Sequence, residues 1–192
     1  RGIQLAQQAR EEAERPDVSI AGCLPPLFGS YAPRLTISYA DTLDIYRRIV
    51  AEQAGQVDLF LCETMASAEE ARAAATAAGE TAKPVWVSWT LDDDAVGLLR
   101  SGENLAEAAD AIADLAIAAR LVNCSRPETI DAALGALKPL GAPVGAYANG
   151  FTETRALKHG GTVDVLHARH DLDPAAYAAF ALAWVDAGLD IV

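Results

Sequence analysis

The sequence predicts an α/β fold of the (β/α)8 TIM barrel type, here incomplete, with about six strand–helix units. Short apolar runs alternate with segments of helical periodicity along the whole chain. Each run is apolar at most positions, as expected for parallel strands that helices cover. A closed barrel needs eight strands and typically about 250 residues, whereas this chain has 192. We therefore expect a single domain over residues 1–192, and a complete doubly wound open sheet is the alternative.

The chain opens with a helix and a first strand. The segment RGIQLAQQAREEAERPD is a polar helix, and Val18–Leu24 follows it as a short apolar run with a β-branched start. Pro25 and Pro26 end this strand, because proline breaks regular structure. Residues 38–41 can cap the next helix, whose apolar side chains recur at helical spacing until Gly55.

Two further strands flank an alanine-rich helix. The run Val57–Thr64 is the second strand. Ser67 with Glu70 has the spacing of a capping box, which predicts that a helix begins there and continues over residues 68–79. Residues 84–91, PVWVSWTL, form the third strand, so the strand–helix pattern has repeated by this point.

The same pattern continues in the second half of the chain. We expect a helix from about Asn104 to Ala118, followed by a short buried strand at residues 121–122. Ser125 and Glu128 again have the spacing of a capping box, and we expect the helix that follows to reach residue 137.

A fifth strand and a last helix complete the predicted order. Residues 143–150, PVGAYANG, read as the strand, and the helix begins at Asp173 and ends at Gly188. The final residues, LDIV, would lie inside a sixth buried strand. We expect the 192 residues to be part of a longer polypeptide, with N-terminal strands and the C-terminal end of the barrel missing.

The composition excludes several classes of function. With 15 basic and 27 acidic residues, the formal charge is −12, which disfavours nucleic acid and anionic membrane surfaces as partners. No apolar run approaches the roughly 20 residues that span a bilayer, and the opening segment is not a signal peptide, so we expect a cytoplasmic protein. The three cysteines are an odd number and are interpreted as reduced thiols.

Side chains able to carry chemistry follow the ends of the expected strands, where a barrel of this kind places its functional groups. They are Cys23, Cys62, Glu63, Thr64, Ser88, Thr90, Asn123, Cys124, Tyr147 and Asn149. Glu63 directly follows an apolar strand, so it either needs a cationic or hydrogen-bonding partner or begins a capped helix. Cys124 lies at a strand-to-helix turn and can be a zinc ligand, a nucleophile or a packing residue.

Other polar residues have simpler interpretations. Cys23 and Cys62 are expected to be packing residues, since free cysteine is often buried. His167 and His170 have a spacing that could bind a metal on a helix, but they precede the last helix and are expected in a loop. The three aspartates at residues 92–94 lack the glycine-centred loop of an EF-hand and are expected to be solvated.

Five segments, in order, resemble the homocysteine S-methyltransferase family. They are LFLCETMASAEEARAA, PVWVSWTL, LRSGENLAEA, LVNCSRPETI and GAYANGF. The resemblance implies a zinc-dependent enzyme that transfers a methyl group from an onium donor to the thiol of homocysteine, giving methionine. It implies that three cysteines hold the zinc. Cys124 matches the first, and the other two are expected beyond Val192.

The resemblance also implies roles for the remaining residues. Glu63 matches the carboxylate that holds the ammonium group of homocysteine, and the substrate site is expected to comprise Glu63, Thr64, Thr90, Asn123, Tyr147 and Asn149. Residues 23–31 and 147–149 depart from the family pattern and leave the methyl donor undefined. The expected partners are homocysteine and a small methyl donor, and a second copy of the chain is considered as a further partner. The alternative is a non-catalytic or truncated relative that binds a small molecule or a protein partner.

Overall fold

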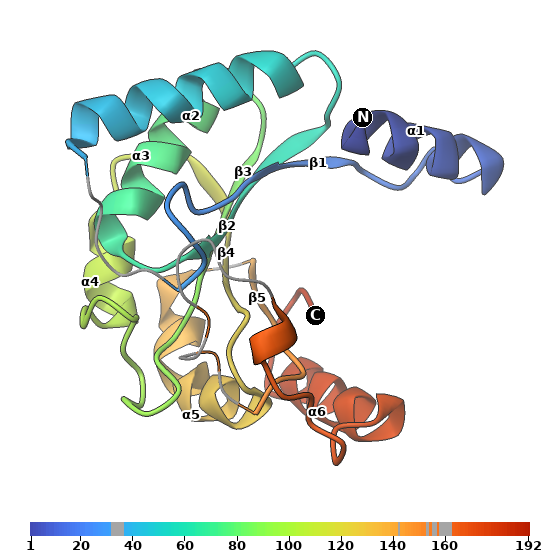
Figure 1. The fold of residues 1–192 in the computed structure, drawn as a ribbon, viewed down its shortest axis with the longest axis vertical. Coiled ribbons are helices and arrows are strands. Elements are labelled where there is room, and N and C mark those ends of the chain that lie inside the picture. The colour runs from blue at the N-terminus through green and yellow to red at the C-terminus, as the bar shows by residue number, and fades with distance from the viewer. Residues whose placement is uncertain (32–36, 142, 153, 155–156, 158–162) are drawn as a thin grey trace.

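The computed structural model contains one parallel sheet of five strands (Figure 1). It describes residues 1–31, 37–141, 143–152, 154, 157 and 163–192. The elements are α1 (Gly2–Glu12), β1 (Ala21–Leu24), α2 (Tyr39–Gln53), β2 (Leu59–Met65), α3 (Ala68–Gly79), β3 (Val85–Trp89), α4 (Leu105–Asp110), β4 (Ile117–Asn123), α5 (Pro127–Leu137), η1 (Lys138–Leu140), β5 (Val144–Tyr147), η2 (Val163–Val165) and α6 (Pro174–Asp186).

The strands lie in the sheet in the order β1-β2-β3-β4-β5, which is also their order along the chain. Each neighbouring pair is parallel, and the last residues continue the series because Ile191 forms a parallel bridge to Gly145 of β5. A doubly wound sheet reverses its strand order at a switch point, and the described strands show no such reversal. The order confirms the incomplete α/β barrel that the sequence predicts.

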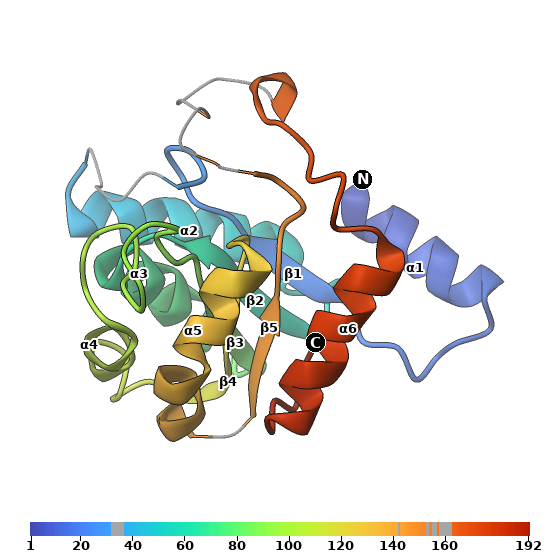
Figure 2. The same cartoon turned by 90° about the horizontal axis from the view of Figure 1, so that it is seen from below.

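The helices form the outer layer of this curved sheet. α2, α3, α4, α5 and α6 contact one another in chain order, so each helix packs beside the next along the same side of the sheet (Figure 2). α1 stands apart near the β1 edge (Figure 1) and has no buried residue. Within the described ranges, none of the helices combines the length and the apolar character needed to cross a bilayer.

The core lies between the sheet and the outer helices. Large side chains from the strands, such as Phe60 and Trp89, are fully buried there together with Tyr46 of α2. The alanines of α3 are nearly all buried, because their small side chains let this helix approach the sheet closely. This packing fixes the strands, and with them the positions of the residues at the strand ends.

One helix differs from its predicted length. The expected helix from Asn104 to Ala118 is α4, which covers only Leu105–Asp110, with Asn104 and Glu107 forming a complete capping box. Turns follow it, and β4 already begins at Ile117, whose Cα pairs with Val85 of β3. Strand pairing has therefore overridden the helical preference of this alanine-rich segment.

The two capping boxes that the sequence predicts differ from the structure. Ser67 accepts a hydrogen bond from the backbone N–H of Glu70 (3.2 Å), but the Glu70 carboxylate accepts from the N–H of Leu27 (3.0 Å), so only half of that box forms. At α5 the Ser125 hydroxyl accepts from the N–H of Leu91 (2.9 Å) and does not cap the helix. In both cases the side chain forms a hydrogen bond to a distant segment in place of the expected capping bond within its own helix.

Candidate active site

The predicted site residues meet at the carboxyl ends of the parallel strands. Glu63 and Thr64 lie near the end of β2, Asn123 and Cys124 at the end of β4, and Tyr147 at the end of β5. Ser88 on β3, with Thr90 and Asn149 just after β3 and β5, completes the group. Hydrogen bonds link every one of these residues to another member of the group, so the structure brings them together.

Asn123 joins the ends of three strands. Its side chain is fully buried, and its Oδ1 accepts from the N–H of Thr64 (3.1 Å) and the hydroxyl of Ser88 (2.8 Å). Its Nδ2 donates to the hydroxyl of Thr64 (2.7 Å). The Asn123 amide therefore links the carboxyl ends of β2, β3 and β4. A direct contact between Asn123 and substrate stays a prediction.

Two residues at the strand ends have left-handed backbone conformations. Thr64 has φ +61° and Cys124 has φ +51°, a region that non-glycine residues seldom adopt. Each such conformation costs about 1–3 kcal/mol and persists only where surrounding contacts impose it. Asn123 holds Thr64. The N–H of Cys124 donates to the carbonyl of Tyr147 (3.1 Å), and its carbonyl accepts from Nδ2 of Asn149 (2.7 Å).

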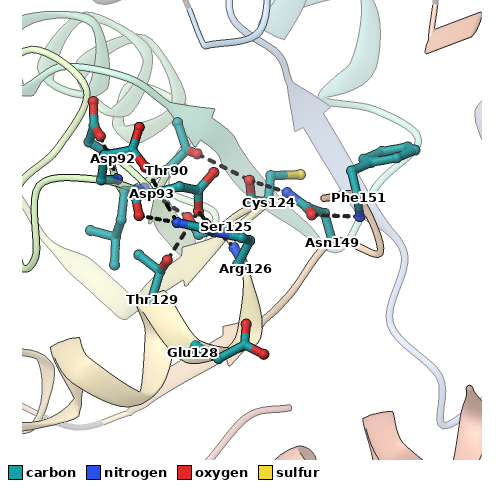
Figure 3. Close-up of polar contacts among 12 residues, drawn as sticks. Thr90, Asp92, Asp93, Cys124, Ser125, Arg126, Glu128, Thr129, Asn149 and Phe151 are labelled. Carbon is teal, nitrogen blue, oxygen red and sulfur yellow. Dashed lines mark hydrogen bonds and ion pairs between the residues drawn. The ribbon is translucent and has the colours of Figure 1, made fainter. Parts of the chain in front are cut away.

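These contacts present the half-buried thiol of Cys124 at the mouth of the sheet. In Figure 3 its sulfur projects away from the Asp93 side chain, on the side of Asn149. Tyr31 lies beside it: burial and the neighbouring Cys124 raise the pKa of the Tyr31 phenol, although the charge of Arg100 opposes this. The guanidinium of Arg100 stacks over the Tyr31 ring at 4.5 Å.

Glu63 is half-buried and is held by neutral donors. The Tyr147 phenol donates to Oε1 (2.9 Å), and the Cys23 thiol donates to Oε2 (3.2 Å). Burial and the carboxylate of Glu63 raise the pKa of Tyr147, and they raise the pKa of Cys23 to about 12. Within the described residues no cationic side chain forms an ion pair with Glu63. The Glu63 carboxylate is therefore fixed in position, and no cationic side chain of the described residues pairs with its negative charge.

Arg100 and Asp93 are site residues that the sequence did not reveal. Arg100 donates to the hydroxyl of Thr90 (3.2 Å) and to Asp93 (3.3 Å), and the side chains of this ion pair are only 7% and 9% exposed. Asp93 also accepts from the N–H of Arg126 (2.9 Å) and the hydroxyl of Thr129 (3.1 Å), so it caps α5 from a distant loop (Figure 3). The expectation of a solvated loop is wrong for Asp93. No sequence signal indicated this contact, because the spacing of Ser125 and Glu128 predicted a local cap for α5.

A cleft of about 470 Å³ lies beside the start of α5 and contains none of the predicted site residues. Arg169 on its wall is paired with Glu128 (2.7 Å) and Asp171 (2.6 Å), and Arg126 lies 3.5 Å from Asp93. These arginines already have carboxylate partners. The strand ends, and not this cleft, carry the candidate chemistry.

The three cysteines lie in different environments, and Cys124 is half-buried at the strand ends. Burial raises the pKa of Cys62, which faces the core, and Cys23 is bonded to Glu63, so both are held as thiols. His167 and His170 lie between η2 and α6. Across the described ranges no three His, Cys, Asp or Glu side chains gather closely enough to hold an ion. The described residues therefore do not by themselves bring together a tetrahedral metal site.

Comparison with known proteins agrees with this arrangement. The family model for homocysteine S-methyltransferase matches residues 1–192. No curated protein sequence matches significantly. Among solved structures, the apo form of the homocysteine methyltransferase MmuM from Escherichia coli is 25% identical, with a TM-score of 0.71 over 98% of this chain and 64% of that chain. Its metallated form is 24% identical, with a TM-score of 0.74 over 98% of this chain and 62% of that chain.

A more distant likeness shows the fold alone. The carboxyl transferase domain of Rhizobium etli pyruvate carboxylase is 18% identical, with a TM-score of 0.56 over 95% of this chain and 28% of that chain. The present chain spans less than two thirds of the E. coli chains that it matches. Since the family model covers all 192 residues, the chain belongs to the homocysteine S-methyltransferase family.

Proposed function

We propose that this chain belongs to an enzyme that transfers a methyl group from an onium donor to the thiol of homocysteine, giving methionine. The substrate thiol gives up its proton to solvent, its sulfur forms a bond to the donor methyl carbon, the bond from that carbon to the donor nitrogen or sulfur breaks, and the donor leaves with a neutral amine or sulfide. Membership of the family and the likeness to the E. coli homocysteine methyltransferase support this proposal.

The observation that carries the proposal is the state of Glu63. Its carboxylate is half-buried, and its two oxygens are bonded by a phenol and a thiol, which contribute no charge. A buried anion is stabilised by a cation, and the ammonium group of an amino-acid substrate supplies one. The resulting charge-assisted hydrogen bond is roughly twice as strong as one between neutral groups. Glu63 would thus select an amino-acid thiol over a simple thiol.

Cys124 would hold the substrate sulfur near this carboxylate by way of a zinc ion. Its thiol is half-buried and its backbone is held on both sides by Tyr147 and Asn149, which suits a ligand. When bound, zinc favours the thiolate form of a ligated thiol at neutral pH. The other two ligands would be cysteines beyond Val192. The existence of a metallated form of the E. coli enzyme supports the assignment of a metal.

The other residues of the site would fix the positions of Glu63 and Cys124. Asn123 fixes Thr64, and with it the turn that follows Glu63, while Thr90 and Asn149 surround the carbonyl of Cys124 (3.4 and 2.7 Å). Preorganised groups of this kind contribute to catalysis because they need no rearrangement when substrate binds. A single domain over residues 1–192, a cytoplasmic location and a homo-oligomeric state stay predictions.

The test is an assay of the full-length protein with homocysteine and a series of onium donors, together with analysis of its metal content. The proposal expects methionine with at least one donor and about one zinc per chain. A non-catalytic relative that binds a small molecule or a partner is the competing interpretation. It would form no methionine with betaine, S-methylmethionine or other sulfonium donors even when zinc is supplied in excess, and that result would refute the proposal.

A further inference from the structure

The Glu63 carboxylate connects the two outermost strands of the five-stranded sheet. Cys23, which donates to Oε2, lies on β1, and Tyr147, which donates to Oε1, lies on β5. Glu63 itself lies on β2, so the bond to Tyr147 spans the concave side of the sheet over the ends of β3 and β4. The carboxylate is therefore fixed from two opposite directions.

The register of β1 against β2 determines where the Cys23 thiol lies. The Cα of Cys23 pairs with that of Leu61. Side chains alternate between the two faces of a strand, so Cys23 is on the same face as Leu61 and Glu63, whereas Cys62 points into the core. Gln53 of α2 further fixes this segment by donating to the carbonyl of Cys23 (3.2 Å). The pairing of β1 with β2 thus places the Cys23 thiol beside Glu63.

The protonation state of the Cys23 thiol suits a hydrogen-bond donor. Its raised pKa, about 12, keeps it protonated at neutral pH, and burial and the neighbouring carboxylate are the causes. A thiol that stays protonated can donate a hydrogen bond but is a poor metal ligand and a poor nucleophile. Cys23 lies on the edge strand β1 and keeps partial access to solvent, unlike Cys62, which is fully buried in the core.

We propose that Cys23 is a positioning residue for the amino-acid substrate, because its thiol and the Tyr147 phenol together fix the Glu63 carboxylate so that the remaining lone pairs meet the substrate ammonium group. This inference rests on the proposed role of Glu63. A free glutamate side chain loses rotamer freedom when it binds a ligand, and a carboxylate fixed in advance avoids that loss. Cys23 therefore acts on capture of homocysteine and not on the methyl-transfer step.

The test uses four variants of the full-length enzyme: Cys23→Ala, Cys23→Ser, Glu63→Gln and the double variant Cys23→Ala/Glu63→Gln. We expect Cys23→Ala to raise the KM for homocysteine about three- to tenfold, as for loss of one hydrogen bond, with kcat and zinc content unchanged. Cys23→Ser should restore most of the affinity, because a hydroxyl also donates. Serine also nearly matches the size of cysteine, so the double variant, and not this rescue, separates an effect through Glu63 from packing. Cys62→Ala is the matched control, since it removes a core-facing thiol and should leave KM unchanged.

The double variant separates this inference from the proposed function. If Cys23 acts through Glu63, the double variant should have the same KM as Glu63→Gln alone. Additive effects, or a wild-type KM in Cys23→Ala while Glu63→Gln raises KM, would overturn the positioning role and leave the proposed function standing. A wild-type KM in Glu63→Gln would overturn both the positioning role of Cys23 and the substrate-binding role of Glu63, whereas absence of methionine from the wild-type enzyme is the result that would overturn the proposed function.

Discussion

Asn123 and Thr64, which lie 59 residues apart, exchange two hydrogen bonds across the end of β3. The N–H of Thr64 donates to Oδ1 of Asn123 (3.1 Å), and Nδ2 of Asn123 donates to the Thr64 hydroxyl (2.7 Å). Because Thr64 has a left-handed backbone, this pair of bonds holds a conformation that the chain would otherwise leave. The residue next to Thr64 is Glu63, so the geometry of the carboxylate depends on an amide two strands away.

Replacing Asn123 with Ala should therefore destabilise the fold. The change leaves the Thr64 N–H and the Ser88 hydroxyl without their buried acceptor, which costs about 2–4 kcal/mol of unfolding free energy. Urea unfolding measures this loss. Asn104→Ala is the control, since it removes an exposed helix cap and should cost only about 1 kcal/mol. Equal losses in the two variants would show that the Asn123 network adds no stability of its own.

Replacing Glu63 with Gln should weaken capture of homocysteine. Loss of the charged hydrogen bond to the substrate ammonium costs about 1.5–3 kcal/mol, which corresponds to a KM raised about ten- to a hundredfold. Zinc content should stay constant. Glu69→Gln makes the same change of charge on the exposed surface of α3 and should leave KM unaltered. If Glu63→Gln also has the wild-type KM, Glu63 does not bind substrate.

Glu70 should make stability depend on pH. Its carboxylate is only 2% exposed and bonds to the N–H of Leu27 and the phenol of Tyr46, and burial raises its pKa above the ordinary value. The protonated form is therefore favoured in the folded state. The stability that it contributes is fully present below the ordinary pKa, near 4.5, and is lost as pH rises through the raised value.

Glu70→Gln removes this titration and keeps an acceptor oxygen for Leu27. Urea unfolding of both proteins from pH 4 to 8 should show the wild type losing stability relative to the variant as pH rises. A constant difference across this range would contradict the raised pKa. Glu69→Gln, the same change at an exposed position of α3, serves again as control.

Breaking the Arg100–Asp93 pair should also destabilise the site. Arg100→Met removes one of the two cations beside a carboxylate that is 9% exposed, although the Arg126 guanidinium still lies 3.5 Å away and the N–H of Arg126 and the hydroxyl of Thr129 still donate to it. We expect a loss of about 2–3 kcal/mol of unfolding free energy. Adding Asp93→Asn should cost less than the two single changes combined, because the partners are in contact. Strict additivity would show that the ion pair contributes nothing.

The sequence predicted the order of strands and the meeting of the site residues, because both follow from local patterns. Apolar runs with caps and breakers located the strands, and a parallel sheet gathers whatever lies at their carboxyl ends. Glu63 and Cys124 could therefore be placed without knowledge of any contact.

What the sequence could not predict depends on contacts between distant segments. The side chains of Ser125 and Glu70 do not form the expected caps, because each accepts a hydrogen bond from a backbone N–H of another loop. Ser125 accepts from Leu91, and Glu70 accepts from Leu27. Nothing near Cys23 in the sequence indicated that its thiol meets Glu63, since only the register of β1 against β2 brings them together. The same is true of Arg100, whose partners Thr90 and Asp93 become its neighbours through the loop after β3.

The central claim is that Cys124 serves the chemistry and not the packing, and the Cys124→Ser variant of the full-length protein tests it most directly. Serine keeps nearly the same size but is a poor zinc ligand at neutral pH. We predict loss of bound zinc and a fall in methionine formation of at least about a hundredfold, with an unchanged circular dichroism spectrum, whereas Cys62→Ala should keep both zinc and activity. A Cys124→Ser protein that retains its zinc and its rate of methyl transfer would contradict the account.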